Sequence, residues 1–460
     1  MNLVAFSIKT KGVHNFARRL RTVFTRFGFT EAQTRRALQA IIDTLRSYNA
    51  APTFFIPAVV LQRHARLIAG IARLGTEIGV HGYVHNDYRT LTNYEQYKQT
   101  RKAVSVFQRL QVPFQGFRNP YLGWNDTSLR VYAALDFTYE SNLAVLHKVI
   151  DVEKLSPRIR SGFEKSLQLF QATACNAYAL RPQFEGTLLR IPTSIPDDEM
   201  LFDRLRITSA GEVGDIWSQV MQRVYDLGGL YTLNLHPERG ILCRQALQLL
   251  LTYACSRPLP VWVTRIGDIA QWWKERSRFR FRLIKVDDTR WQVEAICPAK
   301  ATVLARHLTI EDQPVPRWFG SDERVTTDHF VVHASTCPCI GLSERTPDEV
   351  MNFLHEQGYP TIRCAVEDAG LYAIYLDRAG GLGNTSQERY ATKIALVEQV
   401  ESIERPLLHF GCWPDGYRAA LCISGDIDSV TVQDFFLRIL EVFRPSHMSF
   451  FASLRIRGKP

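Results

Sequence analysis

The stretch EIGVHGYVHNDY, residues 77–88, joins an apolar run to two histidines four positions apart. The run EIGV is typical of a short buried strand, so His81 and His85 follow directly where that strand ends. Four residues of loop, or one helical turn, bring both imidazoles to the same side. Two neutral imidazoles and one carboxylate can hold a zinc ion that keeps an open position for water. The alternative is that both histidines are solvated polar residues at a strand end.

Residues 1–275 alternate apolar runs with longer stretches of helical pattern. The runs typical of strands are LVAFSI (3–8), APTFFIPAVV (51–60), EIGVHG (77–82), GFRNPY (116–121), GLYTLNLH (229–236) and PVWVTRI (260–266). Between the first two, TEAQTRRALQAIIDTLRSY (30–48) carries apolar residues at helical spacing, which predicts an amphipathic helix. Regular alternation of strand and helix predicts an α/β fold with a parallel sheet or barrel. In such folds the active site lies at the carboxyl ends of the strands.

The pattern changes after residue 275. Residues 276–338 contain short alternating runs separated by polar turns, which predict a small antiparallel β module. Residues 339–408 predict a small α+β module with one helix followed by two strands. Residues 409–460 predict a strand, an acidic turn, a helix and another strand.

The composition indicates a folded protein, since 46% of the 460 residues are hydrophobic and 22% are charged. No apolar run approaches the roughly 20 residues that span a bilayer, so no transmembrane segment is expected. The opening MNLVAFSIKTKG lacks the pattern of a secretory signal, which predicts a cytoplasmic protein. The net charge of +10 is spread along the chain, so no nucleic-acid partner is expected.

The nine cysteines favour reduced thiols over a disulfide framework, because they are odd in number and scattered. The close pair CPC (337–339) has no second Cys or His pair at zinc-ribbon spacing. The tryptophans at 272–273 sit in a helical pattern and are expected to pack in the core.

Two further strand ends carry polar residues that suit catalysis. In GFRNPYLGWN (116–125), Arg118 can orient an acid, and Pro120 stiffens the loop so that the backbone N–H of Tyr121 can face an oxyanion. In LNLHPERG (233–240), His236 ends a strand and could donate a proton, although a lone histidine there is often structural.

Taken in order, four motifs resemble those of the polysaccharide deacetylases with a NodB homology domain, carbohydrate esterase family 4. They are TFF (53–55), E-I-G-x-H-x-x-x-H (77–85), R-x-P-Y (118–121) and L-H-P (235–237). The resemblance covers about the first 275 residues. It implies a distorted parallel (β/α) barrel of NodB type that holds Zn²⁺ or another divalent ion. It also implies removal of N-acetyl groups from an amino sugar of a polysaccharide or glycan precursor.

Carried over to this sequence, the resemblance implies a role for each motif residue. His81 and His85 become metal ligands, Arg118 orients the catalytic base, and Tyr121 supplies an oxyanion N–H. His236 becomes the general acid that protonates the leaving sugar amine.

The first strand departs from the family pattern. It should end in an acidic pair, whereas FSIKTKG (6–12) places Ser7, Lys9 and Thr10 there. Lysine is a poor zinc ligand near neutral pH, so the N-terminal copy of the motif is expected to be inactive. This loss favours a second function, a deacetylase-like protein that binds a glycan or an assembly partner without hydrolysing it.

The segment LCISGDIDSV (421–430) resembles the missing piece, with Asp428 fitting the third metal ligand and Asp426 the base. Either this strand docks beside the histidines, in this chain or in a partner chain such as that of a homodimer, or it begins a second module that ends early. A third explanation is an acidic turn that caps the helix from Thr431. The N-terminal strand is expected to occupy the first barrel position, which weighs against docking.

Four residues are predicted to contact the substrate. Asn119, Pro120 and Trp124 lie in the loop around Tyr121, and Asp197 belongs to the acidic stretch PDDEM (196–200). For that acidic stretch the alternative is a solvated turn.

Overall fold

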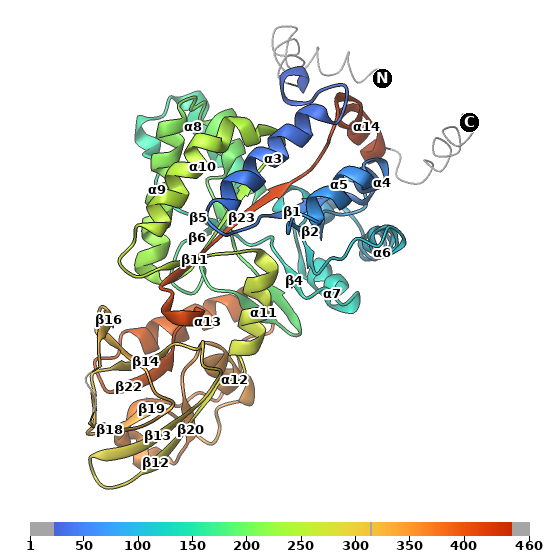
Figure 1. Ribbon diagram of the computed structural model, residues 1–460. Helices are drawn as coiled ribbons and strands as arrows, with labels where there is room; N and C mark the ends of the chain where they lie inside the picture. The colour runs from blue at the N-terminus through green and yellow to red at the C-terminus, as the bar shows by residue number, and fades with distance from the viewer. Residues whose placement is uncertain (1–22, 313–314, 444–460) are drawn as a thin grey trace.

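The computed structural model describes residues 23–312 and 315–443, which form two lobes (Figure 1). The upper lobe is built on a twelve-stranded sheet in the order β6-β5-β9-β10-β23-β1-β2-β3-β4-β8-β7, with β11 also paired to β23. Among the described strand pairs of this sheet, only β7 and β8 run antiparallel. Helices flank the curved sheet (Figure 1), so the predicted α/β fold of NodB type is confirmed.

The strands of this sheet are β1 (Thr53–Ile56), β2 (Glu77–Val80), β3 (Gly116–Phe117), β4 (Tyr139–Glu140), β5 (Ala144–Leu146), β6 (Thr173–Ala174), β7 (Gln183–Glu185), β8 (Leu188–Arg190), β9 (Thr193–Ile195), β10 (Leu230–Leu235), β11 (Val261–Val263) and β23 (Ala419–Asp426). The α-helices of this lobe are α3 (Ala32–Arg46), α4 (Ala58–Arg63), α5 (Ala65–Ala72), α6 (Asn93–Arg109), α7 (Asp126–Ala134), α8 (Pro157–Leu169), α9 (Ala210–Leu227), α10 (Gly240–Cys255), α11 (Ile266–Arg276) and α14 (Val432–Phe443).

Strand β23 enters the upper lobe from the C-terminal part of the chain (Figure 1). It lies parallel between β1 and β10, with Asp426 opposite Phe55 and Gly425 opposite Leu235. Because β2 pairs along the other edge of β1, both edges of β1 are occupied. The expectation that the N-terminal strand fills the first barrel position is therefore wrong for the place beside β1. Residues 3–8 themselves lie outside the described part of the chain.

Helix α3 illustrates how the apolar pattern positions these elements. The stripe Leu38, Ile41, Ile42 and Leu45 is at most 1% exposed. It belongs to the main core that also contains apolar residues of α10 and of the barrel strands. The amphipathic helix predicted within residues 30–48 is confirmed.

The lower lobe consists of three smaller sheets. Two are four-stranded and antiparallel, in the orders β12-β13-β18-β15 and β16-β17-β14-β22, which confirms the predicted antiparallel β structure. The third, β20-β19-β21, is parallel and includes a strand, β19, that the pattern did not predict. Strand β22, which follows helix α13 in the chain, pairs with β14 and so connects the end of this α+β region to the second antiparallel sheet.

The strands of the lower lobe are β12 (Arg280–Lys285), β13 (Arg290–Ile296), β14 (Val303–Arg306), β15 (Thr309–Ile310), β16 (Arg317–Phe319), β17 (Asp322–Val325), β18 (His329–His333), β19 (Cys337–Leu342), β20 (Thr361–Arg363), β21 (Tyr372–Leu376) and β22 (Leu407–Phe410), and its α-helices are α12 (Asp348–Glu356) and α13 (Ser386–Glu401).

The two lobes share a buried joint. Trp272 and Trp273 of α11 are at most 3% exposed, which confirms the predicted core packing, and Trp273 contacts Trp413 at a ring distance of 5.9 Å. The buried guanidinium of Arg276 donates to the carbonyls of Gly411 at 2.8 Å and of Phe410 at 2.9 Å. These bonds satisfy a charge that burial would otherwise make costly. They hold the segment leading into β23 against α11.

Two findings bear on membrane and metal binding. In the described part of the chain, no helix combines the length and the apolar character that a membrane span requires. Cys337 and Cys339 lie in the buried strand β19 with their Sγ atoms 3.3 Å apart. Among the described residues they join no cluster of three potential metal ligands.

Candidate active site

A cavity of about 220 Å³ lies at the carboxyl ends of the central barrel strands. Its lining includes His81 after β2, His236 after β10, Asp426 at the end of β23 and Asp428 two residues later. Parallel strands direct the loops at their carboxyl ends to one rim. Insertion of β23 therefore brings side chains from opposite ends of the sequence into one cavity.

Two histidines and one aspartate form a compact cluster in this cavity. His81 Nε2 lies 3.4 Å from Asp428 Oδ1, and His85 Nε2 lies 3.3 Å from Asp428 Oδ2. One potential ligand atom from each residue lies within 4.8 Å of the other two. Both histidines are buried, at 1% and 6% exposure, so their rings are held by the surrounding protein.

Hydrogen bonding orients His81, and burial affects the pKa of His85. His81 Nδ1 lies 2.8 Å from the carbonyl oxygen of Arg118, so that nitrogen donates and a neutral ring presents its Nε2 lone pair to Asp428. Burial lowers the pKa of His85, although Asp428 opposes the shift. The neutral form of His85 is therefore favoured.

The carboxylate of Asp428 completes a donor set that fits a divalent ion. Burial alone would raise its pKa, but His85 and Arg438 outweigh burial and hold the pKa well below the ordinary value. Its Oδ1 atom is buried and accepts no hydrogen bond from the described residues. Two imidazole nitrogens facing an ionised, unsatisfied carboxylate match the ligand types that zinc prefers.

Arg438 of α14 is a second cation at the same carboxylate. Its Nη1 donates to Asp428 Oδ2 at 2.5 Å. The guanidinium leaves Oδ1 open, but its positive charge opposes a divalent ion on the same carboxylate.

The turn that carries Asp428 is fastened to the barrel through Asp434 at the start of α14. Asp434 Oδ2 accepts from the Thr431 backbone N–H at 3.0 Å and contacts His64 Nε2 at 2.6 Å. Its Oδ1 accepts from Arg63 Nε at 2.6 Å. Asp434 therefore caps its own helix and links it to α4 and to the residue that follows α4.

Asp426 is held by two polar side chains from neighbouring strands. Its Oδ1 accepts from Arg118 Nη1 at 3.3 Å, and its Oδ2 accepts from Asn234 Nδ2 at 2.9 Å. Arg118 is fully buried and also donates to Ser424 Oγ at 2.9 Å. This network fixes the orientation of the Asp426 carboxylate at the cavity wall.

His236 is paired with a buried carboxylate. Its Nδ1 lies 2.7 Å from Asp198 Oδ1, and its backbone N–H donates to Asp198 Oδ2 at 2.9 Å. Burial would lower the pKa of His236, but Asp198 raises it well above the ordinary value. Burial likewise would raise the pKa of Asp198, but His236 and Arg239 lower it to about 2. At neutral pH the pair is therefore an imidazolium beside a carboxylate.

Asp197 and Asp198 do not form a solvated turn, because they are 3% and 0% exposed. Asp197 lines the cavity, and burial together with the neighbouring Asp198 raises its pKa to about 7. Asp197, Asp198 and His236 form a second cluster of potential metal ligands. It fits a cation less well than the first cluster, because a protonated imidazole repels a cation and Asp198 already accepts from His236 and contacts Arg239 at 3.7 Å.

In the loop after β3, Tyr121 lines the cavity, whereas Asn119 does not. Tyr121 lines the cavity with φ of 60°, and its ring meets the edge of His85 at 4.8 Å. Asn119 is fully buried, donates to the carbonyl of Gly123 and accepts from the Tyr132 hydroxyl at 2.5 Å.

Pro120 and Trp124, the other two residues of this loop that are predicted to contact substrate, also lie outside the cavity lining. Pro120 is buried, and the ring of Trp124 is covered by the Arg190 guanidinium at 3.8 Å. Neither these two residues nor Asn119 are among those that line the cavity. Substrate contact by these three residues stays a prediction.

Three residues of the site were not singled out from the sequence: Asn234, Ser424 and Arg438. Asn234 and Ser424 alternate with core residues on β10 and β23, and polar residues inside otherwise apolar strands are a usable signal. Nothing local marks Arg438, which reaches Asp428 because α14 turns back over the cavity.

Comparison with known proteins supports the predicted family resemblance. The family model described as polysaccharide deacetylase matches residues 29–140. Four residues predicted to bind metal or take part in catalysis lie inside the matched segment, namely His81, His85, Arg118 and Tyr121, whereas the two aspartates of β23 and its turn and His236 lie outside it. The comparison with curated proteins finds no match.

Several solved structures are similar over part of the chain. A protein of Mycobacterium smegmatis described as a candidate polysaccharide deacetylase is 21% identical, with 58% of this chain and 85% of that chain covered and a TM-score of 0.42. The peptidoglycan deacetylase PdaC of Bacillus subtilis is 15% identical, with coverages of 52% and 86% and a TM-score of 0.31. A pseudoenzyme of carbohydrate esterase family 4 from Bacillus anthracis is 14% identical, with coverages of 42% and 58% and a TM-score of 0.24. Likenesses this weak carry no argument about function.

Proposed function

We propose that this protein is a metal-dependent hydrolase that removes N-acetyl groups from an amino sugar of a polysaccharide or glycan precursor. The observation that supports this most is the meeting of Asp428 with His81 and His85, beside Asp426 and opposite His236, in one cavity. His81, His85 and Asp428 would hold Zn²⁺ or another divalent ion. When bound, such an ion polarises the amide carbonyl and makes water a better nucleophile near neutral pH.

In the proposed reaction Asp426 is the general base. Arg118 and Asn234 orient its carboxylate by hydrogen bonds, so that it can take a proton from the attacking water. The water oxygen bonds to the acetamide carbonyl carbon. The backbone N–H of Tyr121 faces the oxygen on which negative charge develops.

His236 is the general acid of the same reaction. As the carbon–nitrogen bond breaks, the imidazolium gives its proton to the sugar nitrogen, so that acetate and a free amine are the products. Asp198 keeps this imidazole protonated and fixes its orientation through the 2.7 Å contact.

A second function, glycan binding without hydrolysis, is favoured by one contact. Arg438 already pairs with Asp428 Oδ2, and its positive charge opposes a divalent ion on the same carboxylate. A chain in which this pair persists would hold a glycan beside the cavity but would not activate water.

Acetate release from N-acetylglucosamine oligomers, with added Zn²⁺, Co²⁺ or Mn²⁺, tests the proposal. We expect the wild type to release acetate. Asp426→Asn should lower the rate at least 100-fold, because general-base catalysis contributes about 10²–10⁴-fold. The matched control Asp288→Asn removes a fully exposed acid far from the cavity and should leave the rate unchanged. Absence of release under every metal and pH condition would favour the binding protein instead.

The location, the oligomeric state and the partner of this protein stay predictions. A cytoplasmic location, a homodimer and a glycan precursor as partner are expected from the sequence alone. Size-exclusion chromatography with light scattering would test the dimer, and cell fractionation the location.

A further inference from the structure

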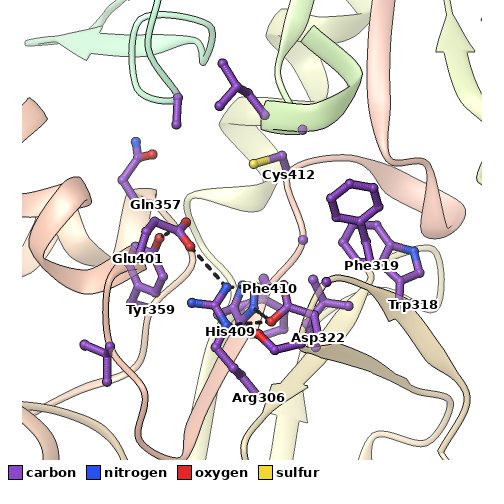
Figure 2. A pocket seen from close by; sticks show the side chains of 18 of the residues that line it. Arg306, Trp318, Phe319, Asp322, Gln357, Tyr359, Glu401, His409, Phe410 and Cys412 are labelled. Atoms are coloured by element: carbon purple, nitrogen blue, oxygen red, sulfur yellow. Dashed lines mark hydrogen bonds and ion pairs between the residues drawn. The ribbon is translucent and has the colours of Figure 1, made fainter. Parts of the chain in front are cut away.

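A second cavity lies between the two lobes and away from the active-site residues. It measures about 660 Å³, against about 220 Å³ for the cavity that contains the histidine cluster. Its walls come from the end of α9, from β14, β16 and β17, from the end of α13 and from the segment between β22 and β23. Figure 2 shows the aromatic side chains of Trp318 and Phe319 on one side of this space and Glu401 with Tyr359 on the other.

Two arginines of the wall are neutralised by two carboxylates. Arg306 donates to Asp322 at 2.7 and 3.2 Å and to Glu401 at 3.1 Å. Arg181 donates to the other oxygen of Glu401 at 3.0 Å. Burial would raise the pKa of Glu401, but Arg181, His409 and Arg306 lower it to about 2, so this carboxylate is fully ionised and engaged.

A third guanidinium in the cavity has no carboxylate partner. Arg418 donates to the backbone carbonyl of Asp226 at 2.5 Å, and no ion pair to it exists among the described residues. It lies over the rings of Phe319 at 3.8 Å and Trp318 at 5.4 Å. Asp226 and Glu404 also border the cavity, but both side chains are exposed, where water screens their charge.

Buried donors on the same wall lack acceptors. The Nε atoms of Arg181 and Arg418 are buried and have no hydrogen-bond partner among the described residues, and Arg181 is only 6% exposed. Unsatisfied buried donors are uncommon and costly. Arg418 also borders the cavity, and no carboxylate of the described residues forms an ion pair with it, so its positive charge is not offset there.

We infer that this cavity is a second binding site, which takes a small organic anion through a phosphate or carboxylate group held by Arg418 and Arg181. Guanidinium groups suit such oxyanions because their planar N–H groups match the spacing of two oxygens. Trp318 and Phe319 would cover the apolar part of the ligand. The site lies apart from the histidine cluster, so the inference does not depend on the proposed hydrolysis.

Calorimetry at fixed ionic strength tests this inference, with glucose 1-phosphate, inorganic phosphate, citrate and uncharged glucose as probes. We expect one site for at least one of the three anions and none for glucose. Binding by the phosphates alone, or by citrate alone, tells which oxyanion is preferred. Arg418→Gln should weaken binding at least tenfold, since a hydrogen bond to a charged group contributes about 1.5–3 kcal/mol.

Three further variants keep the test decisive. Arg317→Gln, a matched change on the exposed face of β16, should bind as the wild type does. Arg418→Lys keeps a positive charge and should retain part of the affinity if Arg418→Gln does not fold. His81→Ala should leave anion binding unchanged, which separates this cavity from the active site. No binding of any anion, or equal binding by wild type, Arg418→Gln and Arg418→Lys, would overturn the inference.

Discussion

Replacement of Asp434 by alanine tests how the turn behind Asp428 is held. Asp434 is 2% exposed and bonds to Arg63 and His64 at 2.6 Å each while it caps α14. Arg63 keeps a second partner, Glu441, at 2.6 Å, so the loss is smaller than for a fully orphaned charge. We expect the free energy of unfolding to fall by about 2–4 kcal/mol, below the sum of a broken buried pair and a lost cap.

The pH dependence of this loss follows from two pKa shifts. Burial would lower the pKa of His64, but Asp434 and Glu31 raise it. The stability that His64 contributes is therefore full below its unfolded pKa of 6.5 and is lost as pH rises through its folded pKa. Burial would raise the pKa of Asp434, but His64 and Arg63 lower it to about 2. The stability that Asp434 contributes is present above its unfolded pKa of 3.8 and is lost as pH falls through its folded pKa of about 2.

Urea unfolding of wild type and Asp434→Ala at pH 5.5 and pH 8 measures both effects. The difference between the two proteins should be larger at pH 5.5 than at pH 8. Glu398→Ala, an exposed change on α13, serves as the control and should alter stability by less than about 0.5 kcal/mol. A difference for Asp434→Ala that is below about 1 kcal/mol at pH 5.5, or greater at pH 8, would refute the reasoning.

Three other changes have defined outcomes. Arg438→Gln removes the guanidinium that competes for Asp428, so zinc affinity measured by chelator competition should rise; an unchanged or lower affinity would contradict the competition. Asp198→Asn should lower the pKa of His236, which NMR titration measures. The variant should also unfold more easily than the wild type, and this difference in the free energy of unfolding should shrink as pH rises through the folded pKa of His236 in the wild type. The reason is that the pair of imidazolium and carboxylate is fully present only below that pKa. Gly116→Ala places a Cβ 2.0 Å from the ring of a buried tyrosine of β4 and should cost about 1–3 kcal/mol or more in urea unfolding; a neutral result would show that β3 and β4 can shift apart.

The local part of the site could be predicted from the sequence. His81 and His236 each follow an apolar strand directly, His85 comes four residues after His81, and the carboxyl ends of parallel strands share one rim. Their meeting in one cavity therefore followed from the strand order. Asp426 and Asp428 were identified through the family resemblance of residues 421–430, which left their position open between three explanations.

The position of β23 could not be predicted, because strand pairing between distant segments leaves no local periodic signal. Both β23 and the N-terminal run 3–8 have the apolar composition of a buried strand, and composition alone does not rank them. Arg438 was missed for the same reason, since its contact depends on where α14 packs after β23. Asp198 was misread because an acidic pair is usually solvated, whereas here Arg239 and His236 balance its charge.

Anomalous diffraction from zinc-soaked crystals tests the central claim most directly. The account predicts one ion about 2.0–2.2 Å from His81 Nε2, His85 Nε2 and a carboxylate oxygen of Asp428, with Arg438 displaced from that oxygen. An ion bound at Asp197, Asp198 and His236 instead, or one held by the two histidines while Asp428 stays on Arg438, would contradict it.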